Sequence, residues 1–185
     1  CFRCDDDVIL EPDYIEKLVK VIDSGYDLAS GVVPLLAYPN FVREIKFVGN
    51  IINEHQLDDT GNLTKNNDDC GYCYDKEKVL PTDQFRTNCL YKKEVHEKVK
   101  YPVNLSPVGF REEGFFSLSA IIESFTIGVN TQAIAYHLPT PSGGCRYPDY
   151  SAKLQIDHET FQKWLIEQFE KHGNFIQKYH EKVVK

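Results

Sequence analysis

The chain has 185 residues, of which 42% are hydrophobic, and it carries a formal net charge of −7. This length is enough for one domain with its own hydrophobic core and is short for two domains. The negative charge disfavours a nucleic-acid-binding protein, which needs a basic face to meet the phosphates. No apolar run approaches the roughly 20 residues of a membrane span, and no charged start leads into an apolar signal region, so we expect a cytoplasmic protein. Peripheral association with a membrane is left open.

The predicted elements begin at the N-terminus. Residues 1–4 alternate in character and lead into Val8-Ile9-Leu10, which predicts extended structure. Pro12 then opens a helix that Gly25 closes, and its apolar residues recur at one-face spacing (Ile15, Leu18, Val19 and Ile22). Residues 27–36 are rich in small and β-branched side chains and predict a buried strand.

The middle of the chain changes character twice. A second apolar run, residues 45–52, precedes a polar stretch at residues 53–81 that is rich in Asp, Asn and Gly, the residues that favour turns. We expect this stretch to be an inserted hairpin or loop. Strand character resumes over residues 85–91, and residues 92–100 predict a short helix that ends before Tyr101-Pro102.

The last part of the chain is mostly helical. Glu112-Glu113 stands at the start of a predicted helix, and residues 126–138 predict one or two strands. After a loop over residues 139–150, one-face apolar spacing predicts an amphipathic helix that ends at Gly173, and a further helix follows it. The alternation of strands and helices predicts an α/β fold, a layered sheet with crossover and flanking helices. We expect one domain over residues 1–150 and a helical extension over residues 151–185.

Three consecutive carboxylates, Asp5-Asp6-Asp7, follow the first predicted strand. Open α/β sheets present their ligands at this end of a strand. Two carboxylates one residue apart can hold Mg²⁺ or Mn²⁺ and let the ion bridge a diphosphate. The alternative is an exposed acidic turn that only favours the N-terminus of the following helix.

The order of strand, Asp5-Asp6-Asp7, Val8-Ile9-Leu10 and amphipathic helix resembles the DxD segment of family 2 glycosyltransferases, which have the GT-A fold. The resemblance implies that Asp5 contacts the nucleotide of a nucleoside-diphosphate sugar and that Asp7 binds the metal. Asp6 occupies the variable position of the motif, on the donor side.

A second segment is similar to the acceptor-side signature of the same family. It runs from Gly109-Phe110-Arg111 through the acidic pair Glu112-Glu113. The resemblance implies that the second acid of the pair, Glu113, is the general base that takes the proton from an acceptor hydroxyl. The family pair is usually Glu-Asp, so the choice between Glu112 and Glu113 stays open. The alternative is an acidic helix start stabilised by the macrodipole.

A third segment ends a predicted strand at His137 and continues into a loop with Gly143, Gly144 and Arg146. It is similar to the region that closes over the donor in several GT-A enzymes. His137 could complete the metal shell, although a lone histidine is more often a hydrogen-bonded structural residue. The two glycines would let the backbone approach a phosphate and Arg146 could pair with a diphosphate, or the segment is a flexible surface loop.

The six cysteines are too few for a disulfide scaffold, so we expect reduced thiols. Cys1 and Cys4 form one CxxC pair, and Cys70 and Cys73 form another. Together they could make a four-thiolate zinc site, but the sequence separation of the pairs is far outside that of a compact zinc ribbon. Cys70 and Cys73 could also bind a metal with ligands from elsewhere.

Taken together, the three segments favour an enzyme of polysaccharide biosynthesis, an inverting, non-processive and Mn²⁺- or Mg²⁺-dependent glycosyltransferase. Its acceptor would be a carbohydrate, a lipid-linked group or a protein. Members of the family begin with a βαβ half that binds the nucleotide, and the resemblance starts after it. We therefore expect that half to be missing and the isolated chain to be inactive. The alternatives are a sugar-phosphate nucleotidyltransferase and a non-catalytic sugar- or protein-binding module.

Overall fold

The computed structural model describes residues 1–34, 46–47, 55–57, 63–65, 76–85, 88–138 and 149–183. The strands in this part of the chain are β1 (Phe2–Arg3), β2 (Val8–Leu10), β3 (Leu28–Pro34), β4 (Lys46–Phe47), β5 (His55–Leu57), β6 (Leu63–Lys65), β7 (Val79–Thr82), β8 (Cys89–Tyr91) and β9 (Ile127–His137). The helices are α1 (Tyr14–Asp23), α3 (Lys93–Lys98), α4 (Glu112–Ile122) and α5 (Tyr150–Val183).

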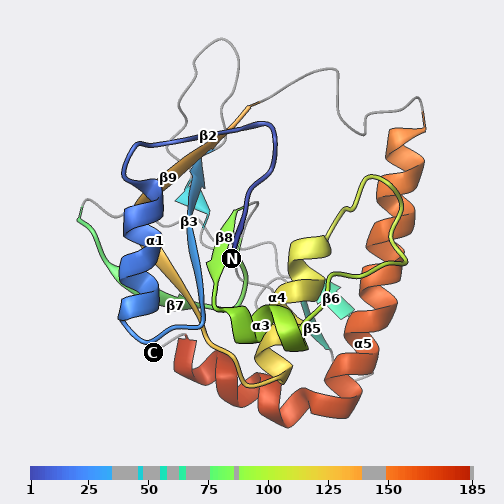
Figure 1. The fold of residues 1–185 in the computed structure, drawn as a ribbon. Coiled ribbons are helices and arrows are strands. Elements are labelled where there is room, and N and C mark those ends of the chain that lie inside the picture. Colours follow the sequence, from blue (N-terminus) through green and yellow to red (C-terminus); the bar gives the residue numbers. More distant parts are fainter. Residues whose placement is uncertain are drawn as a thin grey trace.

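The main sheet has seven strands in the order β1-β8-β3-β9-β2, with β4 paired to β3 and β7 paired to β9. Of the strand pairs described, β3 and β9 run parallel and the others are antiparallel. Helices flank this mixed sheet on both sides (Figure 1). The α/β class predicted from the sequence is therefore confirmed.

Helix α1 covers one face of the sheet. Its buried residues Tyr14, Leu18 and Val21 lie on one side of the helix, three to four positions apart, as an amphipathic helix requires. They pack against small side chains of the two central strands, among them Ala29 and Ala133. The small residues let the helix approach the sheet closely. Helix α1 therefore fixes how far from the sheet the chain runs after β2.

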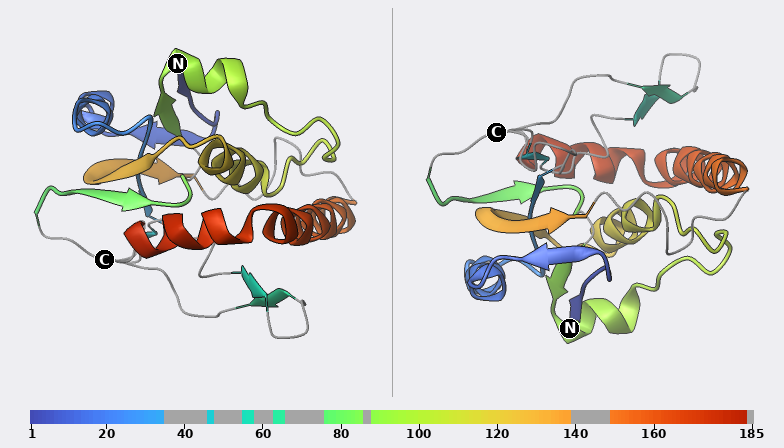
Figure 2. Two further views of the ribbon diagram at one scale, coloured as in Figure 1. Left: turned by 90° about the horizontal axis from the view of Figure 1, so that it is seen from below. Right: turned by 90° about the horizontal axis from the view of Figure 1, so that it is seen from above.

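Helices α3, α4 and α5 cover the opposite face (Figure 2). One cluster joins α3 and α4 to the sheet, with Phe116 of α4 at its centre. A second cluster joins α4 to α5, where the Phe115 ring lies 5.0 Å from Phe161 and 4.6 Å from Trp164, measured between centroids. Helix α4 is thus held between the sheet and α5, which fixes the position of its first turn.

Two hydrogen-bonded groups fasten the end of the sheet nearest to the C-terminal half of α5. The Asp27 carboxylate accepts hydrogen bonds from Lys92 Nζ at 2.9 Å and from the Thr126 amide and hydroxyl at 3.0 and 2.9 Å. Burial opposes the ionisation of Asp27, but these hydrogen bonds outweigh it and hold the pKa below its usual range. The Tyr179 hydroxyl of α5 donates to the Thr82 carbonyl and accepts from the Ile127 amide, both at 3.0 Å.

Several predicted elements differ in the structure. Residues 1–4 and 8–10 belong to separate strands, because β1 pairs with β8 and β2 pairs with β9. Residues 126–138 contain one long strand, β9. The polar stretch does contain a hairpin, β5–β6, but residues 79–81, at its end, are part of β7 and pair with β9 in the main sheet.

The prediction that a helix ends at Gly173 is wrong, because α5 continues through it to Val183. The apolar face of the helix explains the continuation. Phe161, Leu165 and Ile176 lie in one core cluster with residues of α4, so packing extends on both sides of the glycine. Burial of these side chains outweighs the roughly 1 kcal/mol that a glycine costs inside a helix.

Among the helices in the described part of the chain, none combines the length and apolar character needed to cross a bilayer.

Candidate functional site

The predicted acidic cluster lies in the turn between β1 and β2. Here the chain leaves one strand partner and joins another, so Asp5 and Asp7 are not fixed within a continuous ladder. The antiparallel register sets Val8 opposite His137, and the Leu138 amide donates to the Asp7 carbonyl at 2.9 Å. As a result, His137 Nε2 lies 3.3 Å from Asp7 Oδ1. The structure thus brings these two predicted metal ligands together.

Asp5 lies deeper than its neighbours in the turn. Its amide donates to the side-chain oxygen of the buried Asn88 at 3.2 Å, which anchors the turn to the start of β8. Burial raises the pKa of Asp5 to about 6; Arg3 opposes the shift, while the charges of Glu113 and Asp7 add to it. A carboxyl group perturbed in this way by burial and by like charges is a candidate functional group.

The acidic pair stands at the first turn of α4, as predicted. The chain reaches it through two residues with positive φ, Gly109 at 65° and Arg111 at 71°. A left-handed backbone conformation is costly for a residue with a side chain, such as Arg111. The Arg111 guanidinium lies 4.9 Å from the Phe110 ring centre, a cation–π contact. Burial raises the pKa of Glu112; Arg3 opposes the shift and Glu113 adds to it. The helix N-terminus favours the negative charge of both carboxylates.

A buried aspartate of α5 holds the loop that leads to this helix start. Asp157 accepts hydrogen bonds from the Ser106 amide at 2.6 Å, the Ser106 hydroxyl at 2.8 Å and the Phe110 amide at 3.0 Å. Its side chain is fully buried. A buried polar group must be compensated by such hydrogen bonds, which in turn fix the loop that carries Gly109.

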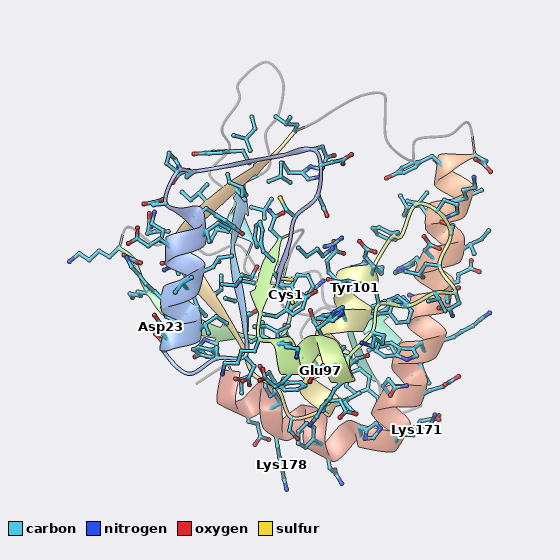
Figure 3. All side chains as sticks on the ribbon, in the orientation of Figure 1. Cys1, Asp23, Glu97, Tyr101, Lys171 and Lys178 are labelled. Atoms are coloured by element: carbon cyan, nitrogen blue, oxygen red, sulfur yellow. The ribbon has the colours of Figure 1, made fainter. Side chains whose placement is uncertain are left out.

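Arg3 joins the acidic turn to the acidic pair. Its Nη2 lies 3.0 Å from Asp5 Oδ1 and also contacts Glu112 Oε1, while its Nη1 lies 3.3 Å from Glu113 Oε1. Burial lowers the pKa of Arg3, but the surrounding negative charges outweigh it and raise the pKa above the usual arginine value. The guanidinium also lies 5.4 Å from the centre of the Tyr101 ring, which is labelled in Figure 3.

Two groups of possible metal ligands result, and they share Asp5. One comprises Asp5, Asp7 and His137, and the other comprises Asp5, Glu112 and Glu113; the donor atoms within each group lie within 4.8 Å of one another. Carboxylate oxygens with one imidazole nitrogen suit Mn²⁺, and carboxylates alone suit Mg²⁺. Asp6 is exposed and belongs to neither group.

Some predicted site residues lie outside the part of the chain that the structure describes. These are the donor-loop residues Gly143, Gly144 and Arg146, and the cysteine pair Cys70 and Cys73. Cys1 and Cys4 are exposed free thiols. The zinc hypothesis for the two cysteine pairs therefore stays a prediction.

Sequence reasoning missed Arg3, Asn88 and Asp157. For Arg3 the signal was its place two positions before Asp5; strand alternation does not extend to Asp5, which lies in the turn after β1. The sequence contains no local signal for Asn88 and Asp157, since each accepts hydrogen bonds from a segment at least 47 positions away.

No protein-family model matches the chain, and no curated protein matches it. The residues of this site are consequently the basis for a proposed function.

Proposed function

We propose that this chain is the metal-binding and acceptor-side part of a glycosyltransferase that moves a sugar from a nucleoside-diphosphate donor to an acceptor hydroxyl. The observation that carries the proposal is the convergence of Asp5, Asp7 and His137 at one end of the sheet, with Glu112 and Glu113 beside the same Asp5. A family 2 enzyme of the GT-A fold needs this combination, a cation site next to a carboxylate base.

Asp5, Asp7 and His137 would hold the ion. They provide two hard oxygen donors and one neutral nitrogen donor, a set that fits Mn²⁺ and, with more water ligands, Mg²⁺. When bound, such an ion neutralises the negative charge that develops on the departing diphosphate. The β2–β9 register positions two of these ligands, since it sets Asp7 and His137 beside each other.

Glu113 is the proposed general base, with Glu112 beside it. A sugar hydroxyl is a poor nucleophile until a positioned carboxylate accepts its proton. Glu113 is half-buried at the first turn of α4, where Arg3 contacts its Oε1, and the proposal assigns its other oxygen to the acceptor hydroxyl. Inversion at the transferred carbon and the transfer of one sugar per encounter follow from the same proposal. The acceptor would be a carbohydrate, a lipid-linked group or a protein.

Metal binding is tested first, by thermal unfolding of the full chain with Mn²⁺ and a nucleoside diphosphate. We expect Mn²⁺ to raise the unfolding temperature, because a ligand that binds the folded state stabilises it. Asp7→Asn should abolish the rise. Asp6→Asn is the matched control, since it makes the same chemical change at the exposed neighbour and should preserve the rise. An equal response of both variants would place the ion elsewhere.

Turnover tests the base in the complete enzyme, by release of free nucleoside diphosphate from a nucleotide sugar. Glu113→Gln should lower turnover by about 10²-fold or more while donor binding stays within twofold. Glu123→Gln, at the exposed far end of the same helix, should have no effect. Unchanged turnover in Glu113→Gln would refute the base assignment. In a separate assay, release of pyrophosphate from a nucleoside triphosphate and a sugar 1-phosphate would indicate a nucleotidyltransferase instead.

A further inference from the structure

The Arg3 side chain lies inside one of the two groups of possible metal ligands. It contacts all three carboxylates of the group formed by Asp5, Glu112 and Glu113. Of the other group, Asp5 is the member with which it forms an ion pair. Its side chain is 19% exposed, so water does little to screen these charges.

The second group would otherwise be the more strongly negative of the two. It has three carboxylates, whereas the first has two carboxylates and an imidazole. The attraction of a divalent ion rises with the number of negative charges around it. Without Arg3, a hard cation would therefore be drawn to Asp5, Glu112 and Glu113 at least as strongly as to Asp5, Asp7 and His137.

We propose that Arg3 is a built-in cation that occupies this second group, so that the site accepts a divalent ion at Asp5, Asp7 and His137 and not at the acidic pair. The inference rests on the proposed function of the site. It gives Arg3 a positioning role for the reaction: a carboxylate bound to a divalent ion is a poor base, and Arg3 leaves an oxygen of Glu113 free of metal. The planar fork of arginine spans the three carboxylates, which the single ammonium of lysine cannot do as well.

The first test counts the Mn²⁺ ions bound by the full chain and by Arg3→Gln, with isothermal titration calorimetry and electron paramagnetic resonance. We expect Arg3→Gln to bind one ion more than the unmodified chain. The two ions should show magnetic coupling, because the two ligand groups share Asp5. The first ion should also bind more tightly, on the order of tenfold, because a positive charge beside Asp5 has been removed. An unchanged number of ions would overturn the inference.

Two controls separate the effect of the positive charge at position 3 from the effect of the net charge of the chain. Arg3→Lys keeps a cation at the position and should bind the same number of ions as the unmodified chain. Lys93→Gln changes the net charge by the same amount at a side chain that is 80% exposed, and it should also leave the number unchanged. An additional ion in the Lys93→Gln protein would mean that net charge alone sets the count, which also overturns the inference.

A second substitution locates the added ion. In the Arg3→Gln background, Glu113→Gln should remove the extra ion, whereas Asp7→Asn should remove the original one. The measured quantity is the difference in the number of bound ions between Arg3→Gln and the unmodified chain. It therefore tests the role of Arg3 even if the unmodified chain binds no ion. That result would refute only the proposed metal site. If Arg3→Gln folds only with Mn²⁺, the ion replaces the guanidinium, as inferred. Failure to fold with or without Mn²⁺ contradicts the inference.

Discussion

Asp157 offers the sharpest test of how the site is held in place. The side chain is fully buried and accepts three hydrogen bonds from Ser106 and Phe110, which precede the acidic helix start. In Asp157→Ala, two partly buried backbone amides lose their acceptor, at roughly 1–3 kcal/mol each. We therefore expect the free energy of unfolding to fall by about 4 kcal/mol. Asp157→Asn keeps one acceptor oxygen and should cost about half as much.

Urea denaturation measures these changes. Trp164 is the sole tryptophan of the chain and packs on Phe115 at the α4–α5 contact, so its fluorescence follows the unfolding of this contact. Hydrogen exchange then reports on the loop itself, where the amides of Ser106 and Phe110 should exchange faster in both variants.

The matched control is Asp149→Asn, near the start of the same helix. Asp149 is 57% exposed and pairs with Lys153 at 3.1 Å, so its loss should cost at most about 0.5 kcal/mol. The reasoning fails if Asp157→Ala stays within the range of this control. It also fails if stability falls while exchange at Ser106 and Phe110 is unchanged, since the carboxylate would then not be holding the loop.

Three further substitutions test packing and electrostatics elsewhere in the fold. Gly173→Ala should raise the free energy of unfolding by about 0.5–1 kcal/mol, because the added Cβ meets open space in a helix; a loss measured by urea denaturation would contradict this. Gly128→Ala should lower it by about 1–3 kcal/mol, because the Cβ would lie 2.7 Å from the Tyr26 ring; unchanged stability would show that the ring can move away at no cost. Asp27→Asn should cost about 1–3 kcal/mol at pH 7, where the carboxylate accepts from Thr126. Burial raises the pKa of Asp27 less than its hydrogen bonds lower it, so the folded pKa is depressed and this stability is present above the unfolded pKa of about 3.9. The difference between Asp27→Asn and the unmodified chain should therefore shrink as the pH falls below about 4, and a constant difference down to pH 2 would refute the role of the charge.

Elements with strong periodicity could be predicted from the sequence, and their partners could not. The apolar spacing indicated where α1 lies, and the acidic pair indicated the start of α4. The predicted face of α1 was partly wrong, because Ile15 and Val19 are 40% and 42% exposed, whereas the buried residues are Tyr14, Leu18 and Val21. Strand pairing depends on which face meets which neighbour, and periodicity does not contain that information. The separate pairing of β1 and β2 is therefore visible only in the structure.

Gly173 shows how a local signal can mislead. Glycine commonly follows the last residue of a helix, so its presence favoured an end there. A longer-range signal was available, because Leu165 and Ile176 are eleven residues apart, which is close to three full helical turns. Both side chains are buried in the same cluster, so the apolar stripe runs across the glycine. Packing on both sides decides the conformation of a residue with no side chain of its own.

The proposed metal ligands had local signals in the sequence, whereas the charges that surround them from distant segments did not. Asp5, Asp7 and His137 end or follow predicted strands, and the structure places them together. The acidic pair is more than 100 residues away in the sequence, so only the fold shows that it shares Asp5 as a neighbour and Arg3 as a counter-ion.

The balance of charge at this junction bears on what the site can bind. Among the described residues, Arg3 contacts the carboxylates of Asp5, Glu112 and Glu113, and Asp7 lies beside Asp5. Burial raises the pKa of Asp5 to about 6, and the nearby negative charges contribute to this shift because like charges so close together disfavour ionisation. Negative charge in excess of the available cations is costly in a half-buried place, and a bound cation would relieve it. A cation is therefore the ligand that we propose for this arrangement, and the separation of β1 from β2 leaves Asp5 and Asp7 outside the ladder.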